Sequence, residues 1–178
     1  EIEKAHPNIL LTFLQVLDDG RLTDTTGTTI DFTNTIIIAT SNVGTRAIQE
    51  IFAHEGSVTE MQDTAMKEVR SHFAPEFLNR FTGISVYNPL TKESVRKITN
   101  LLLADVAKNT AVQGINVTFD ESVINELMLR GFNPEWGTRP MARVIEDTVE
   151  LYLAEKILAK ELKQGDNVHL GMEVFATS

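Results

Sequence analysis

Two short polar segments hold side chains that could carry chemistry. Glu1 and Glu3 are acids two residues apart, just before a helix that starts at Pro7. Asn42 closes a Thr-Ser-Asn tripeptide directly after an apolar run, and an amide at the carboxyl end of a buried strand can orient a water or a phosphate oxygen. Taken singly, the acids are typical of a solvated helix start and the asparagine of a turn.

Two arginines lie beside predicted helices, which would hold their guanidinium groups at fixed positions. Arg80 follows a short helix expected over residues 75–79, whose apolar neighbours would fix it at an edge, although a surface or salt-bridged arginine fits the same pattern. Arg139 stands at the start of a long predicted helix, where a cation opposes the helix dipole and is unfavourable for stability. A local conflict of this kind is a sign of function.

The first half of the chain must supply elements that position these side chains. Apolar residues at helical spacing predict a helix from Pro7 to about Leu17, which ends at Gly20. The polar stretch 21–31 is typical of an exposed loop or hairpin. Residues 35–40 are β-branched and predict a strand buried on both faces. Further elements are expected at 60–72 (helix), 75–79 (short helix) and 84–87 (strand).

A domain boundary is expected at Asn88-Pro89, because proline pushes the preceding residue out of helical geometry. The pattern beyond it predicts helices at 91–111, 120–130 and 139–162 and strands at 116–119 and 167–174. This order is that of a small α+β unit. The two predicted domains are residues 1–89 and 90–178.

Composition and charge narrow the class of protein. The 178 residues are 42% hydrophobic and 23% charged, as in globular proteins, and no apolar run is long enough for a membrane span. The absence of cysteine favours a reducing, cytoplasmic location. The net charge of -9 argues against a nucleic-acid partner. The four histidines lack ligand spacing, so no metal site is expected.

Five motifs occur in an order that resembles one known family. They are EIEKAHP (1–7), LQVLDDGRLTD (14–24), TIIIATSNVG (35–44), PEFLNR (75–80) and GTRPMARVI (137–145). From Glu1 to about Val174 the chain is similar to the Clp family of AAA+ unfoldases, which includes ClpA, ClpB and ClpC. The resemblance implies an α/β fragment of the AAA+ large subdomain at 1–89, followed by a small α+β lid domain at 90–178.

The resemblance also implies a role for each polar residue. Glu1 matches the Walker B glutamate, the general base that polarises the attacking water. Asn42 matches sensor 1, which positions that water, and Arg139 matches sensor 2, a cofactor-binding lid arginine. Arg80 matches the arginine finger, which reaches the neighbouring subunit's nucleotide and can contribute roughly 10³–10⁵-fold in rate.

The segment 18–31 corresponds to the family's second pore loop, beside the translocating polypeptide. Asp19, Gly20, Arg21 and Asp24 are its candidate substrate-contacting residues. Residues 25–28 read Thr-Thr-Gly-Thr, where relatives often carry a more polar or basic Gly-x-Gly-Arg stretch.

The cofactors and partners implied are ATP with Mg²⁺, copies of the same chain in a ring, a hexamer by resemblance, and unfolded or aggregated polypeptide as substrate. No G-x-x-x-x-G-K-[ST] motif occurs, so ATP and Mg²⁺ would be held mostly by residues upstream of Glu1. The chain reads as a fragment, and alone it is expected to be inactive. Residues 52–58 lack the aliphatic–Gly–Phe/Leu tripeptide of relatives that deliver to ClpP, which argues against that peptidase as a partner.

Two alternatives to an unfoldase segment stay open. The isolated chain could be a non-catalytic assembly module, which the missing phosphate-binding loop favours. The parent protein could be an AAA+ motor of another class, such as a clamp loader, although the acidic composition argues against that reading.

Overall fold

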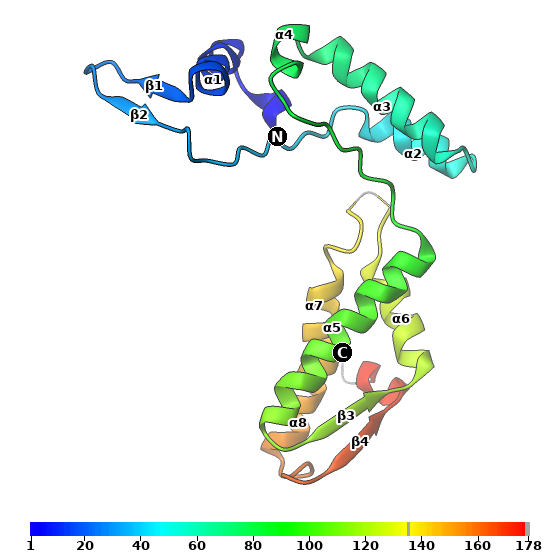
Figure 1. The fold of residues 1–178 in the computed structure, drawn as a ribbon. Helices are drawn as coiled ribbons and strands as arrows, with labels where there is room; N and C mark the ends of the chain where they lie inside the picture. The colour runs from blue at the N-terminus through cyan, green and yellow to red at the C-terminus, as the bar shows by residue number, and fades with distance from the viewer. Residues whose placement is uncertain (135, 177–178) are drawn as a thin grey trace. The chain divides into compact units, whose positions relative to one another are not determined.

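The computed structural model describes residues 1–134 and 136–176, and the chain divides into two compact units between Pro89 and Leu90. Figure 1 labels their elements. The first unit is mainly helical and carries a β-hairpin, whereas the second combines helices with a two-stranded parallel sheet.

Local signals define the helices of the first unit. Its elements are η1 (Ile2–Lys4), α1 (Pro7–Asp19), β1 (Arg21–Thr23), β2 (Thr29–Asp31), α2 (Thr45–Ala53), α3 (Val58–His72) and α4 (Pro75–Leu78). Helix α1 starts with Pro7 and ends at Gly20, whose φ of 63° suits a left-handed cap. Ser57 caps α3, because its Oγ accepts a hydrogen bond from Glu60 N–H at 3.1 Å.

Two apolar groups hold the helices of the first unit. Helices α2 and α3 pack around Ile48, Met61 and Ala65. The rings of Phe73 and Phe77 stack with centroids 5.8 Å apart, and Phe77 and Phe81 meet edge to face at 5.3 Å. This aromatic row fixes α4, and with it the residues that follow α4, onto the end of α3.

The predicted strands at 35–40 and 84–87 are not formed, which corrects the sequence interpretation. Ile36 is 92% exposed and Ile38 82%, so residues 35–40 are not buried on both faces. Tyr87, at the end of the second segment, is 89% exposed. A strand exists only when a neighbour completes its backbone hydrogen bonds, and no described residue pairs with either segment as a strand. The apolar run at residues 35–40 therefore has no regular secondary structure in this chain.

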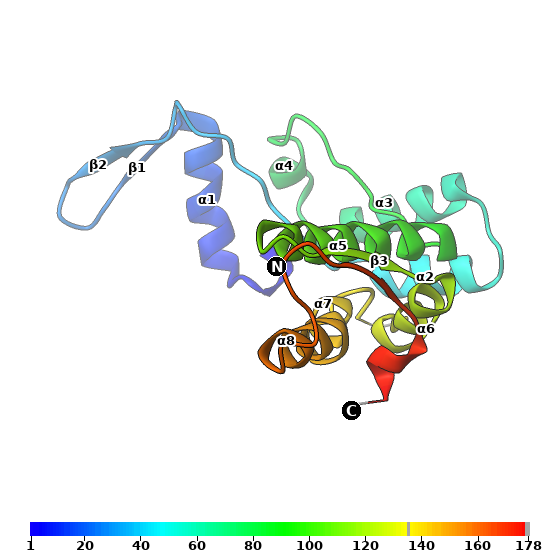
Figure 2. The same cartoon turned by 90° about the horizontal axis from the view of Figure 1, so that it is seen from below.

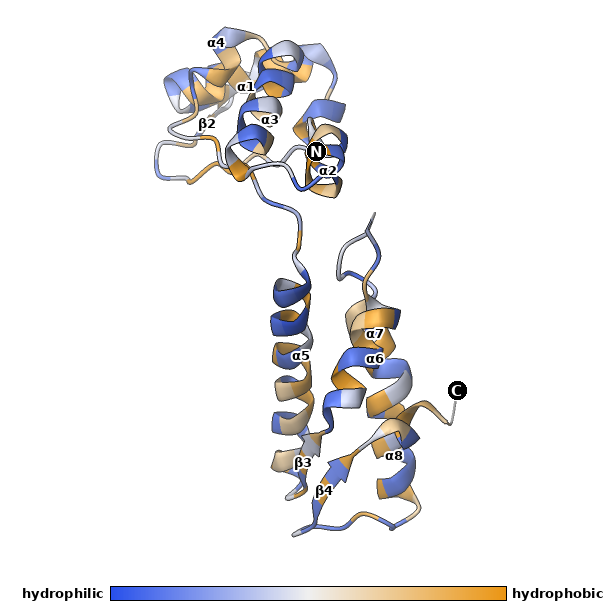
Figure 3. Cartoon of the chain, turned by 90° about the vertical axis from the view of Figure 1, so that its right-hand side faces the viewer, coloured by the Kyte–Doolittle hydropathy of each residue, from blue (hydrophilic) through white to orange (hydrophobic). Residues whose placement is uncertain are grey.

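The second unit has the larger core. Its elements are α5 (Lys92–Val112), β3 (Asn116–Phe119), α6 (Glu121–Gly131), α7 (Met141–Ile145), η2 (Glu146–Glu150), α8 (Leu151–Leu158), β4 (Asn167–Leu170) and η3 (Met172–Phe175). Strands β3 and β4 pair in parallel, with Val117 opposite Val168. In Figure 3 its helices carry both hydrophobic and hydrophilic residues, as amphipathic helices around a core do.

The C-terminal elements differ from the prediction in two places. The helix expected over 139–162 runs from Met141 to Leu158 and contains a π-helical turn, η2. It stops early because Lys160 adopts a left-handed φ of 61°. The strand expected over 167–174 is limited to β4 and is followed by the 3₁₀ helix η3.

Leu127→Ala is expected to destabilise the second unit by about 2–5 kcal/mol, because Leu127 is fully buried in the core and its removal leaves a cavity. Leu129, on the same helix, is 79% exposed, so Leu129→Ala should change the unfolding free energy by less than about 0.5 kcal/mol. Denaturant unfolding followed by circular dichroism and by the fluorescence of Trp136 measures both. Equal effects of the two substitutions would contradict the assigned core.

Candidate functional site

Hydrogen bonds join the N-terminal acidic segment to the segment that carries Asn42. The N–H of Ile2 donates to the carbonyl of Thr40 at 2.9 Å. The N–H of Asn42 donates to Glu3 Oε1 at 3.3 Å. These two bonds, here called the Glu1–Asn42 clip, bring together residues that are 38 and 39 positions apart in the sequence. The structure therefore places the two sequence-predicted residues Glu1 and Asn42 on adjoining segments.

Both acids of the clip are held in their ionised form. The hydrogen bond and charge of Lys4, whose Nζ lies 2.6 Å from Glu1 Oε1, lower the pKa of Glu1. Burial acts to raise the pKa of Glu3, but hydrogen bonds from its own backbone, the Ser41 hydroxyl and the Asn42 N–H outweigh burial and lower it. Glu3 Oε2 is buried and has no partner among the described residues.

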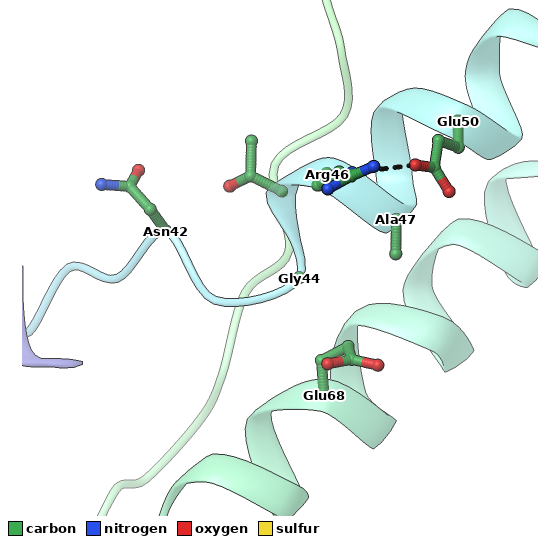
Figure 4. A pocket seen from close by; sticks show the side chains of 7 residues that line it. Asn42, Gly44, Arg46, Ala47, Glu50 and Glu68 are labelled. Carbon is green, nitrogen blue, oxygen red and sulfur yellow. Dashed lines mark hydrogen bonds and ion pairs between the residues drawn. The ribbon is translucent and has the colours of Figure 1, made fainter.

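The Asn42 side chain is exposed and makes no hydrogen bond to another described residue, so its amide is available to a ligand. Figure 4 shows it extending away from Arg46 and Glu50, which pair at 3.0 Å. A hollow of about 460 Å³ lies between the start of α2 and α3. It is lined by Asn42, Gly44, Thr45, Arg46, Ala47, Glu50 and Glu68.

Arg80 stands two residues after α4, at the end of the aromatic row. Its N–H donates to the carbonyl of Phe77 at 3.2 Å, and Phe77 is buried. Its Nε lies 2.7 Å from Asp18 Oδ1, at the end of α1. Both side chains are partly exposed, so the pair adds only about 0–1 kcal/mol to stability.

The predicted pore segment forms the hairpin of β1 and β2, which projects beyond α1 (Figure 2). Of the four residues singled out there, Asp19 and Arg21 are exposed and Gly20 caps α1. The fourth, Asp24, orders the tip. Its Oδ1 accepts hydrogen bonds from the N–H of Thr26 at 2.8 Å, the Thr26 hydroxyl at 2.7 Å and the N–H of Thr28 at 2.9 Å.

The tip should stay ordered down to acidic pH. The Thr26 hydroxyl and the Thr28 N–H lower the pKa of Asp24, so the order is fully present above the ordinary aspartate value of about 4 and is lost only as the pH falls below it. Amide chemical shifts of Thr26 and Thr28, followed by NMR, measure this transition. In Asp24→Ala both amides should already be displaced at neutral pH. A wild-type midpoint above the ordinary value would contradict the assigned bonds.

Arg139 belongs to the second unit, two residues before α7. Its side chain is exposed, and within the described ranges 1–134 and 136–176 it makes no ion pair. Its N–H donates to the carbonyl of Trp136 at 3.4 Å. It therefore precedes the helix rather than opening its first turn, and its guanidinium is exposed.

Each of these side chains offers a group that can contact a phosphate or a water. An ionised carboxylate, an exposed amide and an exposed guanidinium can each contact an attacking water or phosphate oxygens. No group of three or more His, Asp or Glu in the part of the chain that the structure describes could hold a metal ion. None of the helices seen in the described ranges has the length and apolar character needed to cross a membrane.

Two contacts of the site were not predicted from sequence. The sequence gives Glu3 no contact of its own, yet its carboxylate accepts the hydrogen bond from Asn42. Its place two residues after Glu1 in the same motif is the one signal that could have indicated this contact. Asp18 was placed at a helix end with no partner assigned. Ion-pair partners are chosen by tertiary structure, and no local signal distinguishes Asp18 from Asp19.

Known families match both units. The family described as AAA domain (Cdc48 subfamily) matches residues 1–84, and the C-terminal, D2-small domain of ClpB protein matches residues 90–170. Solved structures agree: the S. cerevisiae Hsp104-ADP complex superimposes with a TM-score of 0.82 and 34% identity over 97% of this chain and 30% of that chain. The predicted fold, an AAA+ large-subdomain fragment followed by a small lid domain, is confirmed.

Curated relatives point the same way. The chain is 43% identical to the chaperone protein ClpB of Aquifex aeolicus over 94% of its own length and 17% of the relative's. It is 42% identical to the Clp protease ATP-binding subunit ClpC of Staphylococcus saprophyticus, over 96% of its own length and 22% of the relative's. The chain thus spans about a fifth of the length of these relatives. With both units matched, the chain belongs to the Clp family of AAA+ proteins.

Proposed function

We propose that the complete protein carrying this sequence is an ATP-driven polypeptide unfoldase that works as a ring of identical subunits, a hexamer. The observation that carries the proposal is the Glu1–Asn42 clip, which sets an ionised carboxylate and an unengaged amide on adjoining segments. Among the relatives, ClpB is named a chaperone, and a similar solved structure is titled an Hsp104:casein complex.

Each residue has a defined task in ATP hydrolysis. Glu1 polarises the water that attacks the γ-phosphate, and Asn42 orients that water through its amide. Arg139 contacts the phosphates from the small unit, so that this unit responds to the nucleotide. Arg80 reaches the nucleotide of the neighbouring subunit and neutralises charge that develops in the transition state. Mg²⁺, held mainly by residues outside this sequence, supplies further charge neutralisation when bound.

The β1–β2 hairpin is the part that contacts substrate. Asp19, Gly20, Arg21 and Asp24 lie at its base and tip, and the tip is ordered by the Asp24 carboxylate. A preordered loop loses little conformational entropy when it binds an extended polypeptide. Movement of the small unit with nucleotide state would drive this hairpin along the substrate.

The test uses the full-length protein with a fluorescent unfolded-protein substrate and, separately, labelled DNA. ATP should drive release or unfolding of the protein substrate, a non-hydrolysable analogue should not, and DNA should leave ATP turnover unchanged. Stimulation of turnover by DNA instead of by protein would support an AAA+ motor of another class and overturn the proposal.

The isolated chain fits a second role, that of a non-catalytic assembly module. The sequence contains no phosphate-binding loop motif, while the second unit has a continuous core of its own. Mixing the chain with ATP and measuring phosphate release should give no turnover above buffer. Measurable turnover would contradict this view of the chain.

A further inference from the structure

Arg80 is paired with a residue at the base of the substrate hairpin. Asp18 lies in the last turn of α1, and β1 begins three positions later at Arg21. Arg80 stands two residues after α4, on the other side of the contact. The 2.7 Å contact between Arg80 Nε and Asp18 Oδ1 therefore joins the arginine to the element that carries the hairpin.

The Arg80 side chain stays partly open to solvent while it pairs with Asp18. A guanidinium binds a phosphate or carboxylate best through two nitrogens at once. The contact with Asp18 is made at Nε, on the side of the group. The Arg80 side chain is 49% exposed, which leaves room for such a ligand. Asp18 thus restrains the guanidinium at Nε, and about half of the arginine side chain remains exposed.

Both partners are anchored to rigid backbone. Beside Asp18, Gly20 accepts a hydrogen bond from Phe32 N–H at 2.7 Å, which ties the end of α1 to the residue after β2. A Cβ at Gly20 would lie 2.7 Å from Thr33 Cγ2, so this junction is also closely packed. Beside Arg80, Phe77 is buried in the aromatic row. A displacement of the hairpin base would therefore reach Asp18 and, through it, the guanidinium.

We propose that Asp18 is a positioning residue for Arg80: it orients the guanidinium toward the neighbouring subunit's nucleotide and makes that orientation depend on the base of the substrate hairpin. The inference rests on the proposed function, in which Arg80 acts in trans. It implies that a polypeptide bound at the hairpin of one subunit changes ATP turnover in the next subunit through the Asp18–Arg80 pair.

The test is a double-mutant cycle in the full-length ring. Asp18→Ala should lower kcat by about tenfold to a hundredfold, the cost of a misplaced catalytic group, with little change in KM for ATP. Substrate should no longer stimulate turnover. In an Arg80→Ala background the same substitution should add no further loss, because a residue that acts through Arg80 has nothing left to position.

Matched controls separate positioning from general damage. Asp63→Ala removes an exposed aspartate of α3 that makes no ion pair with any described residue, and it should leave turnover unchanged. Gel filtration reports ring assembly. Asp18→Asn keeps an oxygen near Nε and should lose less than Asp18→Ala; it replaces the alanine variant in the cycle if the latter does not assemble.

The outcomes distinguish this inference from the proposed function. Near-normal turnover in Arg80→Ala would overturn the finger assignment and the inference with it. A large loss in Arg80→Ala together with normal turnover in Asp18→Ala would overturn the inference alone. So would a loss from Asp18→Ala that adds in full to that of Arg80→Ala.

Discussion

Arg80→Ala in the full-length ring is expected to lower ATP turnover by about 10³–10⁵-fold, the contribution of a trans-acting arginine in related phosphoryl-transfer sites. The reason is electrostatic, because the guanidinium neutralises charge that grows on the γ-phosphate in the transition state. Nucleotide binding should be nearly unaffected. The measurement is steady-state phosphate release from assembled rings, with nucleotide affinity determined separately.

A control for charge removal is available on the same unit. Arg70 lies in the last turn of α3, is exposed and has no ion pair among the residues placed in the structure. Arg70→Ala should therefore leave turnover near that of the unmodified ring. Loss of turnover in both variants, or near-normal turnover in Arg80→Ala, would contradict a specific role for Arg80.

Glu1→Gln is expected to lower turnover by about 10²–10⁴-fold while ATP still binds, because glutamine matches the shape of the glutamate but cannot act as a base. The lowered pKa of Glu1 means that its carboxylate is already ionised well below neutral pH, so turnover near neutrality should not titrate with this group. Glu55→Gln, at an exposed position between α2 and α3, is the control and should retain turnover. A Glu1→Gln ring with undiminished turnover would exclude Glu1 as the base.

The two variants also test each other. If each site combines Glu1 of one subunit with Arg80 of the next, a Glu1→Gln subunit can supply Arg80 to the intact site of an Arg80→Ala subunit. Mixed rings of the two inactive proteins should then recover part of the turnover that each lacks alone. Mixtures as inactive as their components would contradict a shared site.

The helices were predictable because their signals are local. Pro7 and Gly20 bound α1, and Thr91 caps α5 by accepting a hydrogen bond from Ser94 N–H at 3.1 Å. The strands at 35–40 and 84–87 were wrong for the opposite reason. A β-branched run indicates that a segment can join a sheet, but the neighbouring strand that makes it a strand lies elsewhere in sequence.

In the candidate site, too, residues within local motifs could be proposed from sequence, whereas their tertiary partners could not. Glu1, Asn42, Arg80 and Arg139 could be proposed from sequence because short motifs surround each one. The hydrogen bonds that join the segments of Glu1 and Asn42 depend on the tertiary structure. The partner of Arg80 was not predictable. Asp18 and Asp19 are adjacent and identical in type, and only the direction in which α1 presents each carboxylate selects Asp18.

The exposed isoleucines of residues 35–40 have a consequence for how this chain can be handled. The run Thr-Ile-Ile-Ile-Ala-Thr has six residues, high β-propensity, no charge and no proline, which is the composition of segments that stack into cross-β fibrils. Ile36 is 92% exposed, and no described strand pairs with the segment. The Thr35 N–H and the Thr40 carbonyl are bonded within the chain, but the backbone groups of residues 36–39 between them can serve as a template for strand addition by another molecule. A completed sheet would bury this segment, but in this chain it is exposed and contains no charged residue or proline that would oppose aggregation.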